Sequence, residues 1–284
     1  MHNKNKHIAI VCNPQAGNGK ALQVADKIVV HLKTKEIFSS LFTAQWPQVW
    51  NNITEAWIVG GDGTLNYFIN QYPDIQIPLS IFKGGTGNDF QELLYGNIIL
   101  EEQIDKVLNG SPHLVDAGIC NKKLFLNGIG IGFDGSIVKE LLNKKKKSGR
   151  RIYLSTVLKK ILFYKGIDHT IEFDDRNISE KLLMVNVANA KTEGGGFCVA
   201  PNASIEDGKL DLNIVKELNS LQRLIYLSKI EKGKHLDLPA IQYYQIKKIK
   251  ISTSILIPAH MDGEYFETNS FIVECLPKRF SFLW

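Results

Sequence analysis

The sequence predicts an N-terminal three-layer α/β domain with a parallel sheet, followed by a C-terminal β-sandwich domain. Strand-like and helix-like segments alternate over residues 1–118, which is typical of a parallel sheet covered by helices. Three glycine-rich turns follow apolar runs within this part. Beyond it, several short strand-like segments are separated by polar turns. We therefore predict an α/β domain at 1–118 and a β-rich domain at 119–284, whose last segment can return to the first domain.

The most informative turn is the run Gly-Gly-Asp-Gly-Thr at residues 60–64, which stands between an apolar run at 56–59 and a helix-like segment at 65–69. Glycines have no Cβ, so backbone N–H groups at such a turn are open to a phosphate. A bare carboxylate would repel phosphates, so Asp62 suggests a metal ion. A tight turn with an exposed aspartate is the alternative.

Two further turns follow the same logic. Residues 13–20 follow the apolar run 8–12, and residues 84–89 follow the apolar stretch 78–82. In an open α/β sheet, ligands bind at the carboxyl ends of the strands, so the three turns are expected to converge on one nucleotide. None of the turns is a Walker A loop or a dinucleotide fingerprint.

The second half reads as strands over several short stretches, interrupted by a helical stretch at 151–164. The predicted strands are residues 181–188, 210–215, 246–252, 254–257 and 271–275.

Positive charge is concentrated in one place. The formal net charge is +5, and the run Lys144–Arg151 carries six positive charges, so the rest of the chain is slightly acidic. The run and the apolar residues after it fit peripheral contact with an anionic membrane surface. A solvated loop, with a helix packed into its own domain, is the alternative. No nucleic-acid motif accompanies the run, so we expect no nucleic-acid partner.

Other sequence features exclude some classes of protein. No apolar run approaches the ~18 residues that a membrane-spanning helix needs, and the N-terminus lacks the apolar core of a signal peptide. The four cysteines are scattered, which favours a reducing compartment. We therefore expect a cytoplasmic protein, peripheral to the inner face of the membrane. The seven histidines form no zinc-binding motif, so we expect no zinc site.

Three motifs, N-P-x-x-G, G-G-D-G-T and G-T-G-N-D-F, resemble the diacylglycerol kinase catalytic domain of bacterial lipid kinases related to sphingosine and ceramide kinases. The resemblance continues through residues 125–134, 189–211 and 262–264, and so covers nearly the whole chain. It implies a nucleotide domain of the type shared with NAD kinases, a β-rich lipid domain and a cleft between them. The implied activity is transfer of the γ-phosphoryl group of ATP to a hydroxyl of a diacylglycerol-like lipid.

The resemblance also assigns residues to the nucleotide. Asp62 is the expected Mg²⁺ contact, either directly or through water. The residues expected to bind ATP are Asn13, Pro14, Gly17, Thr43, Gly60, Gly61, Asp62, Gly63, Thr64, Asn66, Gly85, Thr86, Gly87 and Asn88.

The residues expected to be catalytic, and a further residue expected to bind metal, lie in the second half of the chain. On residues alone Asp262-Gly263-Glu264 is a turn, but the resemblance makes Asp262 the general base and Glu264 its supporting partner. The resemblance also places a structural Mg²⁺ at Asp207, where local rules indicate only a turn. Asp134 is either an acid near the site or a helix-capping residue.

The chain departs from the family pattern before and after the third turn. Lys83-Gly84 stand where the family has a proline and an apolar residue, and Gln91-Glu92 replace the usual Ala-Arg. Lys83 either contacts a phosphate or points to solvent.

Two other functions share part of the pattern. NAD kinases also carry G-G-D-G-T, but the Asn-Glu pair expected of them is missing after Leu114. A non-catalytic nucleotide- or lipid-binding regulator would not need Asp62, Asp262 and all three turns intact. A homodimer is expected only from the general frequency of two-fold oligomers.

Overall fold

The computed structural model describes residues 6–143 and 150–284. It divides into two compact units. Unit 1 is Met1–Val115 with Lys278–Trp284, and unit 2 is Asp116–Pro277. Within the basic run Lys144–Arg151, residues 144–149 lie outside the described residues.

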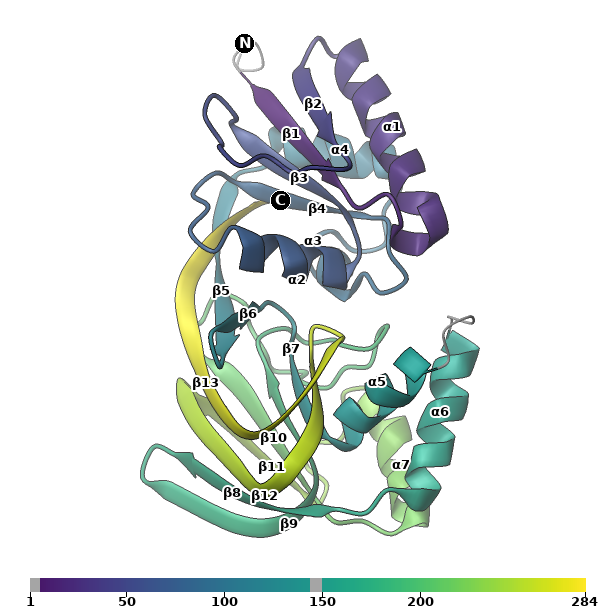
Figure 1. The fold of residues 1–284 in the computed structure, drawn as a ribbon, viewed down its shortest axis with the longest axis vertical. Helices are drawn as coiled ribbons and strands as arrows, with labels where there is room; N and C mark the ends of the chain where they lie inside the picture. The colour runs from purple at the N-terminus through teal and green to yellow at the C-terminus, as the bar shows by residue number, and fades with distance from the viewer. Residues whose placement is uncertain (1–5, 144–149) are drawn as a thin grey trace. The chain divides into compact units, whose positions relative to one another are not determined.

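Unit 1 contains a parallel sheet in the strand order β4-β3-β1-β2 (Figure 1). Its central strands are almost entirely apolar and buried, as strands covered on both faces must be. The strands are β1 (His7–Cys12), β2 (Phe38–Phe42), β3 (Glu55–Gly60) and β4 (Leu79–Lys83). The predicted α/β class is confirmed.

Helices cover both faces of this sheet. The chain steps from β1 outward to β2, and from β3 in the opposite direction to β4. Because crossover connections are right-handed, the helices of these two steps lie on opposite faces. The helices are α1 (Lys20–Thr34), α2 (Asp62–Gln71), α3 (Asp89–Tyr95) and α4 (Leu100–Asn109). The reversal of direction between β1 and β3 creates a topological switch point at their carboxyl ends, where ligands of such sheets bind.

Unit 2 is built mainly from antiparallel strands and confirms the predicted β-sandwich class. Two long strands bend, so that each pairs with β8 along one half and with β7 along the other. These bent strands are β9 (Arg176–Ala188) and β12 (Lys248–Met261). The others are β5 (Pro112–Cys120), β6 (Lys123–Phe125), β7 (Gly128–Gly132), β8 (Ile167–Phe173), β10 (Leu210–Lys216), β11 (Ile241–Ile246) and β13 (Glu264–Leu283).

Three helices pack beside the strands of unit 2 (Figure 1). They are α5 (Phe133–Asn143), α6 (Arg150–Phe163) and α7 (Ser220–Glu231). The predicted helix at 151–164 corresponds to α6, whereas α5 and α7 were not predicted. Among residues 6–143 and 150–284, no helix is long and apolar enough to cross a bilayer.

The last residues of β13 belong to unit 1. Phe282 pairs with Leu79 of β4, and its ring lies 5.2 Å from that of Phe90. Tyr95 donates a hydrogen bond to the carbonyl of Leu283 at 2.8 Å. The end of the chain is therefore part of the core of unit 1.

The substitution Phe282→Ala should lower the free energy of unfolding by about 3–5 kcal/mol, because it empties a fully buried site. Urea denaturation of the full chain measures this change. Phe163→Ala is the matched control, since that ring is 75% exposed, and it should change stability by less than about 0.5 kcal/mol. Equal effects of the two substitutions would contradict the packing described for Phe282.

Candidate active site

The three glycine-rich turns of unit 1 touch one another through their backbones. A Cβ at Gly61 would lie 2.4 Å from the carbonyl oxygen of Gly87, and one at Gly85 would lie 2.4 Å from the Cα of Gly61. A Cβ at Gly17, where φ is +57°, would lie 2.4 Å from the carbonyl oxygen of Gly84. The structure therefore brings together the three turns that the sequence singled out.

Backbone hydrogen bonds join the same turns. The N–H of Asp62 donates to the carbonyl of Gly87 at 3.2 Å, and that of Gly84 donates to Gly60 at 2.8 Å. Within the third turn, Asn88 accepts from the N–H of Gly85 and donates to its carbonyl, both at 3.1 Å. These hydrogen bonds hold the three turns against one another.

Asp62 is the first residue of α2, where the positive end of the helix dipole stabilises its carboxylate. Its Oδ2 accepts a hydrogen bond from the N–H of Asp89, and its Oδ1 accepts one from Phe90, both at 3.0 Å. Asp62 therefore holds the start of α3 against the start of α2. This orients its carboxylate at the switch point.

The other residues predicted to bind the nucleotide lie on the same turns or beside them. Thr64 and Asn66 are buried in the first turns of α2, whereas Thr86 is exposed in the third turn. Thr43 directly follows β2. Lys83, left open between phosphate and solvent, forms an ion pair with Glu92.

Asp262 of unit 2 lies in the turn between β12 and β13, with φ at +47°. Its side chain is buried and accepts three backbone N–H bonds, from Leu126 and Asn127 at 2.9 Å and from Gly128 at 3.0 Å. These donors fix the direction of the carboxylate. Glu264, predicted to support it, begins β13 and its side chain is exposed.

Asp207 lies at an exposed turn and accepts a hydrogen bond from the N–H of Lys209 at 3.0 Å. Two further carboxylates, those of Asp116 and Asp211, accept hydrogen bonds in the same part of unit 2. Asp116 accepts from the N–H of Gly208 at 2.6 Å, and Asp211 accepts from the Tyr243 hydroxyl at 2.6 Å. Burial and then the negative charge of Asp207 raise the pKa of Asp211, although the Tyr243 bond opposes them. The turn thus concentrates negative charge.

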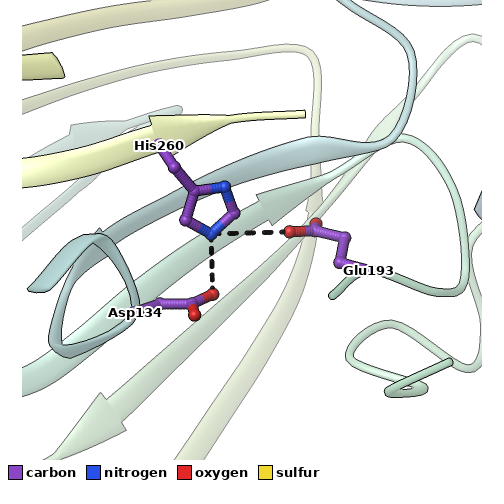
Figure 2. A group of neighbouring side chains, drawn as sticks. All are labelled: Asp134, Glu193 and His260. Atoms are coloured by element: carbon purple, nitrogen blue, oxygen red, sulfur yellow. Dashed lines mark hydrogen bonds and ion pairs between the residues drawn. The ribbon is translucent and has the colours of Figure 1, made fainter. Parts of the chain in front are cut away.

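A second polar group in unit 2 was not predicted as a site (Figure 2). His260 Nε2 lies 2.9 Å from Oδ2 of Asp134 and 4.0 Å from Oε2 of Glu193. His260 and Glu193 are buried, and Glu193 also accepts a hydrogen bond from Asn186 at 3.1 Å. We call Asp134, Glu193 and His260 the acid–histidine cluster. Asp134, left open between an acid near the site and a helix-capping residue, lies in the first turn of α5 and bonds His260.

The members of the cluster shift each other's protonation. Burial alone lowers the pKa of His260, but the charge and hydrogen bond of Asp134, followed by the charges of Glu193 and Asp262, raise it to about 9. Burial raises the pKa of Glu193 to about 8, although the charge of His260 opposes the rise. The cluster therefore holds protons near neutral pH and lies within electrostatic reach of Asp262.

Sequence reasoning missed Glu193 and His260 because they are far apart in the chain. The available signal was the strand Gly128–Gly132, in which glycine alternates with isoleucine. Ile129 and Ile131 belong to the hydrophobic core, so the glycines face the other side of the strand. A strand face without side chains leaves space for large polar groups.

Comparison with known proteins gives two family matches. Residues 7–120 match the diacylglycerol kinase catalytic domain, and residues 127–284 match the YegS C-terminal NAD kinase beta sandwich-like domain. A relative from Shewanella frigidimarina, named "Probable lipid kinase YegS-like", is 27% identical over 82% of this chain and 77% of its own length. A Bacillus subtilis diacylglycerol kinase is 27% identical over 72% of this chain and 69% of its own.

The fold is also similar to a solved structure. The crystal structure of a diacylglycerol kinase from Bacillus anthracis str. Sterne has a TM-score of 0.74 and a sequence identity of 23%. The similarity covers 99% of this chain and 97% of that one. At 23% identity this similarity supports the fold alone.

The acid–histidine cluster should make the protein less stable as pH rises. Both folded pKa values are raised, so the stabilisation is complete below the unfolded values of 6.5 for His260 and 4.5 for Glu193, and is lost as pH passes about 8 and then about 9. The free energy of unfolding of wild type, measured with urea and a chelator, should fall by more than about 1 kcal/mol between about pH 5 and about pH 9.

Glu193→Gln keeps the shape of the protonated acid, so this variant should show a smaller fall than wild type. Glu101→Gln on the exposed face of α4 is the matched control and should behave as wild type. A wild-type profile that is flat, or that rises over this range, would contradict the proposed protonation of the cluster.

Proposed function

We propose that this chain, which belongs to the bacterial lipid kinase family that joins a diacylglycerol kinase catalytic domain to a YegS C-terminal domain, transfers the γ-phosphoryl group of ATP to a hydroxyl of a diacylglycerol-like lipid. Members of this family are phosphotransferases that use ATP. The observation that carries the finer proposal is the interlocked set of glycine turns at the switch point of unit 1. Phosphoryl transfer depends mainly on such positioning and on charge neutralisation.

Unit 1 binds the donor in this proposal. The N–H groups of the three turns and the start of α2 that are not bonded within the turns receive the phosphates, because helix starts present N–H donors to anions. Asp62 contacts Mg²⁺, directly or through water. Carboxylate oxygens suit this ion, which usually retains several waters of its own. The ion offsets the repulsion between Asp62 and the phosphates.

Unit 2 binds the lipid acceptor in this proposal, and its Asp262 is the general base. The base must lie within hydrogen-bond reach of the attacking hydroxyl and hold one orientation. The three N–H donors from residues 126–128 provide that orientation. Because the transition state is loose, the carboxylate needs chiefly to orient the hydroxyl and accept its proton late. Glu264 is proposed as a supporting residue at the same turn.

Asp207 is proposed to hold a structural Mg²⁺. Its support is the local concentration of carboxylates, which includes Asp116 and Asp211. Asp211 Oδ2 is buried without a hydrogen-bond partner among the described residues. A cation bound at Asp207 would offset the negative charge of the turn.

The lipid chains require apolar surface. An apolar cavity beside α6 and α7 has a volume of only about 30 Å³, which is small for an acyl chain. The outer faces of these helices are instead exposed and apolar. Their exposed residues are Leu158, Leu162, Phe163, Leu221, Leu224 and Ile225. We propose that this apolar helix face contacts the inner surface of the membrane, assisted by the basic run Lys144–Arg151.

Substitution of the base tests the reaction. Asp262→Asn should lower transfer of labelled phosphate from ATP·Mg²⁺ to a lipid alcohol in mixed micelles by at least about 100-fold. ATP binding should be retained, since the nucleotide residues belong to unit 1. The acceptor panel includes diacylglycerol, phosphatidylglycerol, a sphingoid base and a long-chain polyprenol.

The matched control is Glu264→Gln, which removes a charge two residues away on an exposed side chain and should cost less activity. Thermal unfolding of each variant separates loss of chemistry from loss of fold. If Asp262→Asn transferred phosphate to the accepted lipid as fast as wild type, Asp262 would not be the base.

The membrane contact has a separate test. Phe163→Ser should weaken co-sedimentation with anionic vesicles about tenfold or more, because Phe163 is 75% exposed and its burial in lipid is worth about 1.5–3 kcal/mol. Phe38→Ser, at a site 65% exposed on β2, is the matched control and should bind as wild type. Replacing Lys144 to Lys147 with alanine should weaken binding only at low salt. Identical binding by Phe163→Ser and Phe38→Ser would remove the helix face from the proposal.

A further inference from the structure

The acid–histidine cluster gathers three side chains from three separate elements (Figure 2). Asp134 comes from the first turn of α5, Glu193 from the loop after β9, and His260 from the end of β12. One nitrogen and two carboxylate oxygens, one from each residue, all lie within 4.8 Å of one another. A tetrahedral ion with bonds of about 2.0–2.2 Å needs its ligand atoms a little over 3 Å apart. The separations of 2.9 Å and 4.0 Å at His260 Nε2 bracket that value.

One carboxylate oxygen in the cluster has no hydrogen-bond partner among the described residues, and its one ion pair, with His260, is long at 4.0 Å. Among the described residues, Glu193 Oε2 is buried and accepts no hydrogen bond, although Asn186 bonds the other oxygen. Glu193 is only 5% exposed, and its carboxylate points toward His260 (Figure 2). Buried charged groups are normally paired, hydrogen-bonded or bound to a metal. A buried carboxylate oxygen that faces His260 without a hydrogen bond is therefore suited to bind a cation.

The strand beneath the cluster is shaped to give it room. A Cβ at Gly130 would lie 2.4 Å from His260 Nε2 and 2.5 Å from Asp134 Oδ2, and one at Gly128 would lie 2.1 Å from Glu193 Oε1. Neither glycine has a positive φ, so neither is required by its backbone conformation. Because glycine has no side chain at these two positions, the three ligand groups have room above the strand.

We propose that Asp134, Glu193 and His260 bind a first-row transition-metal dication, such as Zn²⁺ or Mn²⁺, with a water at a remaining position. An imidazole nitrogen with two carboxylates suits these ions, and the nitrogen disfavours Mg²⁺, which prefers oxygen. Two carboxylates balance the charge of the dication when His260 is neutral. The site is distinct from the Mg²⁺ contacts proposed at Asp62 and Asp207, and it does not rest on the proposed reaction.

The absence of a zinc motif in the sequence does not count against this site. Zinc motifs place ligands a few residues apart, whereas these three ligands are joined only by folding. The ion would tie the start of α5 and the loop after β9 to the end of β12. His260 is two residues before Asp262, so the ion would also stabilise the strand end that carries the proposed base.

Cobalt binding tests the site directly. The full chain, stripped of metal with a chelator and kept free of nucleotide, is titrated with Co²⁺ in excess Mg²⁺. We expect one equivalent to bind with visible absorption from a low-symmetry site, and Zn²⁺ to displace it. His260→Asn and Glu193→Gln should each weaken Co²⁺ binding at least about tenfold. Glu193→Gln is nearly isosteric, so it keeps the test valid if His260→Asn folds poorly.

Two controls separate this site from others. His31→Asn alters another histidine–carboxylate pair, in which His31 Nε2 lies 3.7 Å from Asp105, and Asp207→Asn alters the proposed Mg²⁺ turn. Both variants should bind Co²⁺ as wild type does. The proposal is overturned if wild type shows no Co²⁺ absorption under these conditions. It is equally overturned if Co²⁺ binds and Glu193→Gln leaves the affinity unchanged, or if either control abolishes binding.

Discussion

Unit 1 depends on backbone segments that approach one another more closely than any Cβ atom would allow. Gly61 and Gly85 touch across two turns, and Gly17 reaches the carbonyl of Gly84 from a third. Because carbonyl and amide groups meet directly, the turns fix each other's shape by backbone hydrogen bonds. The same glycines carry no Cβ that would keep a phosphate away from the backbone of the turns. One steric constraint therefore supports both the fold at the switch point and the proposed nucleotide site.

Unit 2 uses missing side chains for a different purpose. The alternate glycines of β7 turn one face of a buried strand into space for Asp134, Glu193 and His260, while its isoleucines fill the core on the other face. The same strand begins with the N–H of Gly128, which binds Asp262. The polar groups of unit 2 are thus organised from a single short strand. The negative charges of Asp134, Glu193 and Asp262 raise the pKa of His260, whereas burial is the main cause of the raised pKa of Glu193.

The sequence predicted the parts of the molecule whose signals are local. Continuous apolar runs ending in glycine turns identified β1, β3 and β4, and the confirmed α/β class follows from them. The helix α7 was missed because its apolar residues lie on both its core-facing and its exposed sides, so no single apolar stripe marked it. β12 was predicted as two strands because a register shift between Ser252 and Ile257 interrupts its pattern.

The candidate sites show the same limit. A glycine turn motif located Asp62, whereas the resemblance to the kinase family singled out Asp262 at its turn. The bonds that each carboxylate makes, to α3 and to residues 126–128, join segments far apart in the chain and could not be predicted. Glu193 and His260 have no local motif, and only the folded sandwich brings them to Asp134. The proposed roles of these residues remain predictions.

The most direct test of the account is a comparison of acceptors for wild-type enzyme with labelled ATP·Mg²⁺. Lipid alcohols in mixed micelles and NAD are supplied in parallel reactions. The account predicts a labelled phospholipid product and no labelled NADP. Formation of NADP without any lipid product would contradict it, because the glycine turns would then serve a different acceptor and Asp262 a different hydroxyl.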